Sequence, residues 1–350
     1  GLVAEIMGRK AGVCAGYGGS QHLAFRNFHS NGVQAGMTGI GVGLAAALKS
    51  KSSQGIVAII IGDGTLGEGL LYESMNLASI WNVPVLFVVE HNGIAQTTYT
   101  RDTIGGDIVA RGKAFGLSAW RLSDRDENFS AEVEAVIENL RENRRPGMLV
   151  IDTGRLGPHS KGDDLRDVVE RDELAAADPL MALAARLPVD QVEQIKSTCK
   201  TFLLEVEKSA MESALSSFEI APEHTFRPAL NIDFPKADPA SVNVRLALND
   251  ALQKLLEYDK DVVLIGEDLH DPYGGAFKVT AGLSERFKGR VISTPISEAG
   301  ITGAGIGLAM AGKKPIVEIM FADFLTLCMD QIYNHAVKFP GMFVESAIPI

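Results

Sequence analysis

Cysteine is scarce in this 350-residue chain, and the three cysteines present lie far apart in the sequence. Cys14, Cys199 and Cys328 match no zinc-binding spacing, and their odd number indicates no disulfide framework. We therefore expect a reducing compartment, which would be the cytoplasm or, in a eukaryote, the mitochondrial matrix.

Basic residues are also in deficit, and long apolar runs are absent. The chain has 33 basic and 44 acidic residues, a net charge of −11. This balance argues against a nucleic-acid-binding face. The longest apolar runs, such as residues 83–89, are well short of the roughly 18 residues needed to span a bilayer. The sequence therefore predicts a globular protein that binds neither nucleic acid nor membrane.

The two ends of the chain each interrupt a structural pattern. Residues 1–6 have the pattern of an amphipathic helix, without an initiator methionine or a signal peptide. Residues 347–350 read as the beginning of a strand. We interpret the sequence as an internal piece of a longer protein, truncated at both ends.

Short apolar runs alternate with helical patterns along most of the chain. Runs that are apolar on both faces are typical of buried parallel strands, so the alternation predicts an α/β fold with doubly wound parallel sheets. The expected strands are residues 56–61, 83–89, 148–151, 262–265, 291–293 and 315–320. A proline-containing linker at 221–241 would separate a first domain with a helical tail (1–220) from the beginning of a second (242–350).

A glycine-rich pattern occurs twice. Residues 39–45 and 303–309 both read G-x-G-x-G-L-A, and each run is followed by an apolar strand and an aspartate, Asp63 or Asp323. In one interpretation, small residues only let two helices pack close to their sheets. In the other, two similar α/β domains flank one site.

The run from Gly62 to Gly67 follows an expected strand and reads G-D-G-T-L-G. It matches the dinucleotide fingerprint, with Glu90 at the end of the next strand as a ribose-binding acid. However, Asp63 would place a carboxylate beside a diphosphate. Magnesium would remove this conflict, and Asn92 supplies a second oxygen ligand at the end of the next strand. The structural alternative is that Asp63 caps a helix and Asn92 makes a turn.

The motif around Asp63 and Asn92 resembles the thiamine diphosphate signature, and further motifs make the resemblance specific. The chain resembles the decarboxylating component of 2-oxoacid dehydrogenases, of the pyruvate or branched-chain type, with alpha and beta parts fused. Alpha-like motifs are residues 7–10 (MGRK), 18–22 (GGSQH), 31–32 (NG), 159–164 (HSKGDD) and 178–180 (DPL). Beta-like motifs are residues 266–268 (GED), 274–275 (GG), 294–298 (TPISE), 320–324 (MFADF) and 330–331 (DQ).

The resemblance implies a thiamine-diphosphate-binding fold and assigns roles to individual residues. Magnesium would be held by Asp63, Asn92 and the carbonyl of Ile94. The positions implied in cofactor binding are Gly32, Gln34, Gly62, Gly64, Glu267 and Phe324, of which Phe324 would stack on the pyrimidine ring. Without the resemblance, Phe324 would be read as a core aromatic and Glu267 as a solvated acid.

Two residues are implied in the chemistry itself. Glu298 would hydrogen-bond the pyrimidine nitrogen and so promote deprotonation of the thiazolium carbon; its alternative role is a helix N-terminal acid. His159, in a polar, glycine-rich segment expected to be mobile, would approach the reacting carbons and assist acyl transfer. The sequence departs from the family at His91, where a second asparagine is usual, and at Pro158, where glycine is usual.

The implied activity is oxidative decarboxylation of a 2-oxoacid, with acyl transfer to the lipoyl group of a partner acyltransferase. A homo-oligomer is also implied. The alternatives are an acetoin dehydrogenase, a transketolase-like enzyme and a non-catalytic cofactor-binding or assembly module. A Rossmann oxidoreductase is the least favoured.

Overall fold

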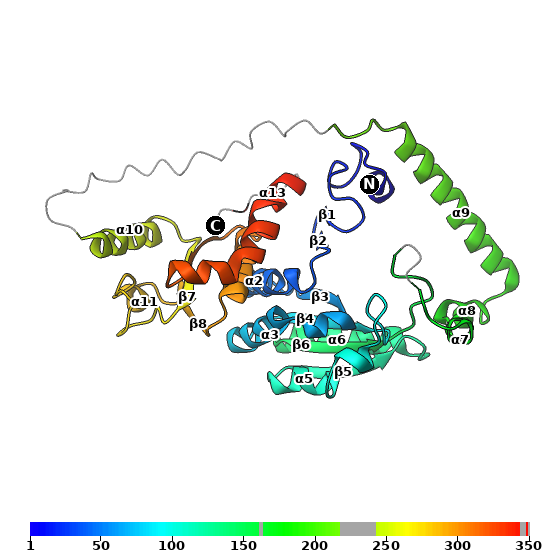
Figure 1. Cartoon of the computed structure of the whole chain (residues 1–350), viewed down its shortest axis with the longest axis horizontal. Helices are drawn as coiled ribbons and strands as arrows, with labels where there is room; N and C mark the ends of the chain where they lie inside the picture. The colour runs from blue at the N-terminus through cyan, green and yellow to red at the C-terminus, as the bar shows by residue number, and fades with distance from the viewer. Residues whose placement is uncertain (161–163, 218–242, 344–347, 349–350) are drawn as a thin grey trace.

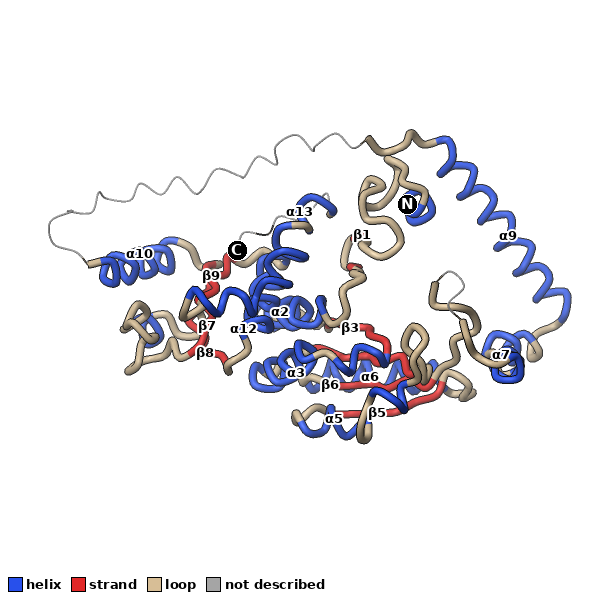
Figure 2. Tube along the Cα trace, viewed as in Figure 1, coloured by secondary structure: helices blue, strands red, loops and turns tan. Residues whose placement is uncertain are grey.

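Two parallel sheets, one of four strands and one of three, organise the chain in the computed structural model, which describes residues 1–160, 164–217, 243–343 and 348 (Figures 1 and 2). The first sheet has the order β3 (Val57–Gly62), β4 (Val85–His91), β6 (Gly147–Asp152), β5 (Ser118–Ser123). The second has the order β8 (Val291–Thr294), β7 (Val262–Glu267), β9 (Lys314–Glu318). The predicted α/β class with parallel sheets is confirmed, whereas the predicted linker at 221–241 lies outside the described residues.

The side chains of β4 show why the first sheet needs helices on both faces. Phe87 and Val89 pack into one core, and Leu86 and Val88 pack into another on the opposite face. The first face is covered by α2 (Gly36–Ser50), α3 (Gly69–Trp81) and α5 (Ile108–Ala114), and the second by α6 (Phe129–Asn143). Because successive side chains alternate between faces, a strand that is apolar throughout must be buried on both sides.

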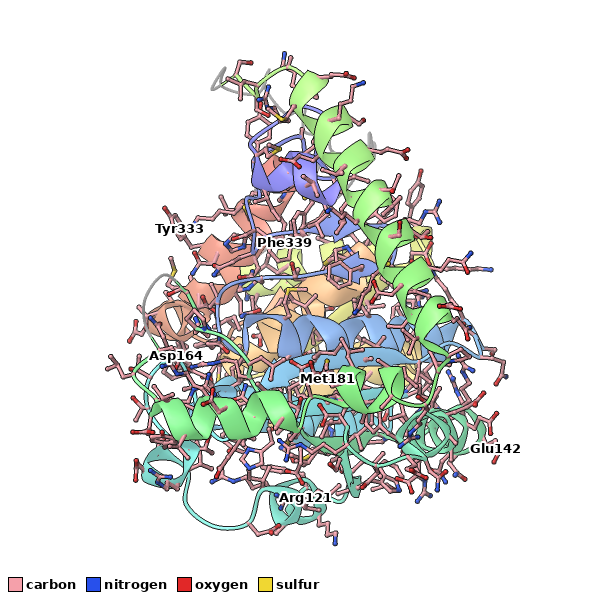
Figure 3. All side chains as sticks on the ribbon, turned by 90° about the vertical axis from the view of Figure 1, so that its right-hand side faces the viewer. Arg121, Glu142, Asp164, Met181, Tyr333 and Phe339 are labelled. Carbon is pink, nitrogen blue, oxygen red and sulfur yellow. The ribbon has the colours of Figure 1, made fainter. Side chains whose placement is uncertain are left out.

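The second sheet is covered in the same way. Leu264 faces a core formed with α10 (Val244–Tyr258) and α11 (Leu283–Arg286), whereas Ile265 faces α12 (Glu298–Met310). The chain then continues through the short helices η2 (Ala322–Cys328), η3 (Gln331–Val337) and α13 (Phe339–Met342). Phe339 of α13 is fully buried and points inward, whereas Tyr333 of η3 is exposed at the outer side (Figure 3).

The two glycine-rich helices, α2 and α12, pack directly against each other. A Cβ atom added at Gly43 would lie 2.1 Å from the carbonyl oxygen of Ala304, and one at Gly307 would lie 2.0 Å from that of Ile40. Gly41 instead faces its own sheet, where a Cβ would lie 2.5 Å from Ile59. The glycines of the repeated pattern therefore allow close contact with a sheet, as in the first interpretation, and also with the glycine-rich helix of the other domain.

The remaining elements lie around this core. They are α1 (Leu2–Ile6), β1 (Ala24–Phe25), β2 (Phe28–His29), η1 (Asp63–Gly67), α4 (Thr100–Thr103), α7 (Val168–Ala176), α8 (Pro179–Ala184) and α9 (Val189–Glu212). The long α9 runs along the outside of the molecule, where it contacts α1 (Figures 1 and 3). In the described ranges, no helix is both long and apolar enough to cross a membrane.

Candidate active site

The carboxyl ends of β3 and β4 bring Asp63 and Asn92 to one edge of the first sheet. The two strands are parallel neighbours, and Gly62 pairs with Glu90 in the register. Asp63 follows β3 directly, and Asn92 follows β4 directly. The predicted adjacency of these two residues is therefore confirmed, and it lies at the edge where α/β sheets bind ligands.

Asp63 is almost fully buried, with 1% of its surface exposed. The hydrogen bonds that hold its carboxylate are all made to one of its two oxygens, Oδ2. Its Oδ2 accepts hydrogen bonds from the amide of Gly93 at 2.8 Å and the hydroxyl of Thr100 at 2.9 Å. The same oxygen lies 3.0 Å from Nδ1 of His91. Within the described residues no hydrogen bond is made to Oδ1. The carboxylate is thus fixed in orientation with one oxygen left for another ligand.

The loop after β4 presents further oxygen atoms beside Asp63. The Asn92 side chain accepts a hydrogen bond from the amide of Ile94 at 3.1 Å, and the amide of Thr100 donates to the carbonyl of Gly93 at 2.9 Å. Across the described part of the chain, no group of three or more His, Cys, Asp or Glu side chains is arranged to bind a metal. One carboxylate, one amide oxygen and the Ile94 carbonyl form a donor set that fits magnesium, which retains water and phosphate ligands, and does not fit zinc.

The segment before α2 borders the same loop. The hydroxyl of Thr65 in η1 donates to the Gln34 side chain at 2.5 Å, which connects residues 32–36 with the Asp63 loop. Gln34 and Gly32 are exposed. A Cβ at Gly32 would lie 2.3 Å from the Gln21 side chain, and one at Gly64 would lie 3.0 Å from Ala95, whereas Gly62 has no atom within 4 Å of that position. A Cβ at residue 64 would therefore be tight against Ala95, whereas one at residue 32 would displace only the flexible end of Gln21, and residue 62 has space.

The N-terminus of α12 brings carboxylates from both domains together. The amide of Ser297 donates to Glu267 at the end of β7 at 3.3 Å, and the amide of Gly300 donates to Glu73 of α3 at 2.9 Å. Glu298 lies between Ser297 and Gly300 in the sequence and is the first residue of the helix. Glu73 is a site residue that the sequence did not reveal, because its contact depends on how α2, α3 and α12 pack together.

Burial and crowding change the acidity of this cluster. Burial raises the pKa of Glu267, the nearby Glu298 and Asp268 raise it further, and the Ser297 amide partly offsets the rise. Burial and Glu267 also raise the pKa of Glu318. Such shifts by desolvation and like charge are typical of functional sites.

Phe324 lies near the same helix start. It belongs to η2 and is 37% exposed. The thiol of Cys328 contacts the carbonyl oxygen of Glu298 at 3.5 Å and that of Phe324 at 3.7 Å. The structure therefore brings Glu298, Glu267 and Phe324 together on the second domain.

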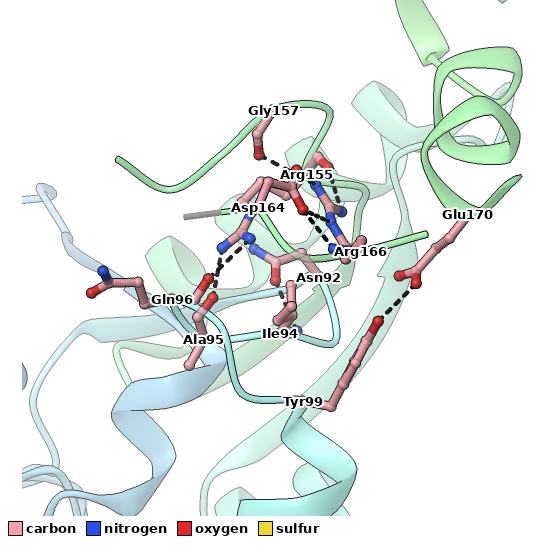
Figure 4. A network of polar contacts seen from close by, with 10 residues as sticks. All are labelled: Asn92, Ile94, Ala95, Gln96, Tyr99, Arg155, Gly157, Asp164, Arg166 and Glu170. Carbon is pink, nitrogen blue, oxygen red and sulfur yellow. Dashed lines mark hydrogen bonds and ion pairs between the residues drawn. The ribbon is translucent and has the colours of Figure 1, made fainter. Parts of the chain in front are cut away.

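An arginine network connects the His159 segment with the loop after β4 (Figure 4). Arg155 donates to the carbonyl oxygens of Ala95 at 2.6 Å and Gln96 at 3.1 Å, immediately after Ile94. Arg166 is buried and donates to the carbonyl oxygen of Arg155 at 2.7 Å and to Asp164 at 2.7 Å. This guanidinium holds the pKa of Asp164 well below its usual range.

His159 is exposed and lies in the sequence between Arg155 and Arg166 of this network. Hydrogen bonds of Arg155 and Arg166 hold the described residues on either side of the segment, and its mobility stays a prediction. Residues 161–163 lie outside the described residues. The arginine contacts could not be predicted from the sequence, because most of them are made to main-chain oxygens.

Comparisons with known proteins identify the family of each part of the chain. The Dehydrogenase E1 component family matches residues 1–223, and the Transketolase, pyrimidine binding domain family matches residues 240–342. The pyruvate dehydrogenase E1 component subunit alpha of Rickettsia typhi is 34% identical over 167 residues, which cover 46% of this chain and 51% of that protein. The 2-oxoisovalerate dehydrogenase subunit beta 2, mitochondrial, of Arabidopsis thaliana is 43% identical over 125 residues, which cover 35% of this chain and 34% of that protein.

A solved structure shows the same fold. Transketolase from Campylobacter jejuni matches 87% of this chain and 50% of its own, with a TM-score of 0.58 and 18% identity. The fold and the two family matches together define a transketolase-like thiamine diphosphate protein. The chain belongs to the dehydrogenase E1 component family, with an alpha-type domain and a beta-type pyrimidine-binding domain in one chain. It spans about half the length of its alpha-subunit relative.

Proposed function

We propose that the protein containing this chain decarboxylates a 2-oxoacid and transfers the resulting acyl group to a lipoyl group on a partner acyltransferase. The observation that supports this most strongly is the site shared between two domains. Asp63 on the first domain has one oxygen left for a cation, and Glu298 on the second begins a helix that is hydrogen-bonded to Glu73 of the first.

The first domain would bind the diphosphate end of the cofactor. Asp63, Asn92 and the Ile94 carbonyl would hold Mg²⁺, and the metal would neutralise the diphosphate. His91, Gly93 and Thr100 keep Asp63 from rotating away from the metal. When bound, thiamine diphosphate supplies a nucleophilic carbon and an electron sink for loss of carbon dioxide.

The second domain would bind and activate the pyrimidine end. Glu298 would exchange a proton with the pyrimidine nitrogen, and Phe324 would stack on the ring, while Gly32 and Gln34 approach from the first domain. Glu267, next to Glu298, is buried, and burial raises its pKa, so the protonated form of Glu267 is favoured beside the proposed pyrimidine site.

The His159 segment would act in acyl transfer. Arg155 anchors this segment to the carbonyl oxygens that follow Ile94, so its position is coupled to that of the metal-binding loop. His159 would then donate or accept a proton as the acyl group moves to the lipoyl sulfur. We also propose that the protein functions as a homo-oligomer.

The test is a panel of 2-oxoacids offered to the full-length gene product with thiamine diphosphate and magnesium. Turnover would be read first with an artificial electron acceptor and then with a lipoyl domain. Acylation of the lipoyl domain by a 2-oxoacid supports the proposal. Transfer to an aldose, oxidation of acetoin alone, or cofactor binding without any turnover would each contradict it in favour of one of the alternatives.

A further inference from the structure

A row of three phenylalanine rings leads away from the candidate catalytic residues. Phe324 packs edge-on against Phe321 with ring centroids 5.5 Å apart, and Phe321 packs edge-on against Phe277 with centroids 5.4 Å apart. The rings are 37%, 43% and 56% exposed, so exposure increases along the row. Exposed aromatic surface next to polar catalytic groups is characteristic of a ligand-binding site.

The row lies at the carboxyl edge of the second sheet. Phe321 comes shortly after β9, and Phe277 lies in the loop 268–282 that follows β7. The two strands are parallel neighbours, so both segments leave the sheet at the same edge. Glu267 ends β7 at this edge. The rings therefore lie on the same side of the domain as the carboxyl cluster.

The loop that presents Phe277 is firmly braced. The amide of Gly275 donates to the carbonyl of Asp268 at 3.0 Å, and the buried hydroxyl of Thr280 donates to that of Leu269 at 2.9 Å. The side chain of Asn249 in α10 donates to the carbonyl oxygen of Val279 at 2.7 Å. Gly274 has a φ of +69°, and a Cβ there would lie 2.6 Å from the backbone of Ala281.

This bracing gives Phe277 a defined position although its ring is more than half exposed. A flexible loop would have to lose conformational entropy before it could contact a ligand, whereas a braced loop has already done so. The same loop also offers an internal comparison. Tyr273 is 51% exposed, but its ring lies against the ammonium of Lys278, with Nζ 5.4 Å from the ring centroid. Tyr273 is not one of the three rings of the phenylalanine row.

We propose that Phe277, positioned through Phe321, contacts the side chain of the 2-oxoacid and sets the preference for its length. The inference rests on the proposed function, because it takes Phe324 as the residue against the cofactor's pyrimidine. The row extends from Phe324 by two further rings. An aliphatic side chain of the 2-oxoacid that extends away from the reacting carbon would therefore contact apolar surface. Long aliphatic side chains would gain from this contact, whereas the methyl group of pyruvate would not reach it.

The test compares Phe277→Ala with Tyr273→Ala in the full-length protein. For Phe277→Ala, kcat/KM for 2-oxo-4-methylpentanoate should fall about tenfold or more relative to pyruvate, as apolar contacts worth one methylene give roughly 10–200-fold. Phe277→Tyr, which keeps the ring, should restore the ratio, and Tyr273→Ala should leave it unchanged. Binding of acylphosphonates of increasing chain length, measured by calorimetry, should show the same order without turnover.

The outcomes separate this inference from the proposed function. Normal pyruvate turnover with an unchanged substrate ratio in Phe277→Ala overturns the inference and leaves the proposed function in place. An altered oligomeric state of Phe277→Ala by sedimentation, again with an unchanged ratio, overturns it in favour of a contact with a second copy. If the unmodified protein turns over no 2-oxoacid, both are overturned.

Discussion

The ionisation of the buried Glu267 side chain should affect the stability of the folded protein. Burial raises its pKa, and Glu298 and Asp268 raise it further. The folded protein therefore binds this proton more tightly than the unfolded chain does. Stability associated with Glu267 is present at acid pH and is lost as the pH rises from the unfolded pKa, about 4.3, through the folded pKa.

Glu267→Gln should therefore raise the melting temperature, and by more at pH 8 than at pH 4. Glutamine can still accept the hydrogen bond from Ser297 but cannot ionise. Each kcal/mol of relief should raise Tm by roughly 4–8 °C in a domain of about 100 residues. Calorimetric melts at the two pH values measure the effect, and a Tm difference that is independent of pH would contradict the account.

Glu298 has a different expected effect, on chemistry more than on affinity. Glu298→Gln keeps the size of the side chain but removes the exchangeable acid. Hydrogen–deuterium exchange at the thiazolium carbon of the bound cofactor should slow by about 10²–10⁴-fold, the usual contribution of general acid–base catalysis. Quenched-flow NMR measures this exchange, and calorimetry serves as the control for cofactor affinity. Exchange at the wild-type rate would leave Glu298 with only a role as a helix N-terminal acid.

At the level of elements, the contact between α2 and α12 joins the two domains. The glycines at this contact allow backbone to approach backbone, so even one methyl group has no space. Gly307→Ala would place a Cβ 2.0 Å from the carbonyl oxygen of Ile40. The helices would have to separate, at a cost of about 1–3 kcal/mol from overpacking.

The matched control for this prediction is Gly69→Ala at the start of α3. No atom lies within 4 Å of the position that its Cβ would take, so the change should be neutral or stabilising by up to about 1 kcal/mol. Urea denaturation gives both values. Equal stability of the two variants would show that the helix contact does not determine how the domains pack.

The elements also show what could be predicted from sequence. The expected strands at residues 56–61 and 83–89 correspond to β3 and β4 within two residues, because strands that are apolar on both faces have a clear pattern. The edge strand β5 was not predicted, since its run S-A-W-R-L-S is only partly apolar. The helical tail expected at the end of the first domain is divided into several helices, with Pro179 at the beginning of α8.

At the scale of the whole molecule, some residues of the candidate site could be placed from the sequence, whereas others come together only through tertiary packing. Asp63 and Asn92 could be placed together because each follows a strand and the strands are neighbours. The contact of Glu73 with Gly300 joins residues 227 positions apart and depends on how the two domains dock. The roles of Glu298, His159 and Phe324 came from family resemblance, and they stay predictions.

The central claim is that the two domains form one magnesium-dependent thiamine diphosphate site, and calorimetry on the full-length protein tests it most directly. We expect the cofactor to bind only with magnesium. Asp63→Ala and Asn92→Ala should weaken binding by about 100-fold or more, since even the outer partners of metal ligands are worth about 10–100-fold. Asp102→Ala, which removes a nearby exposed carboxylate, should bind normally. Cofactor binding that is equally tight with and without magnesium, or unchanged in Asp63→Ala, would contradict the account.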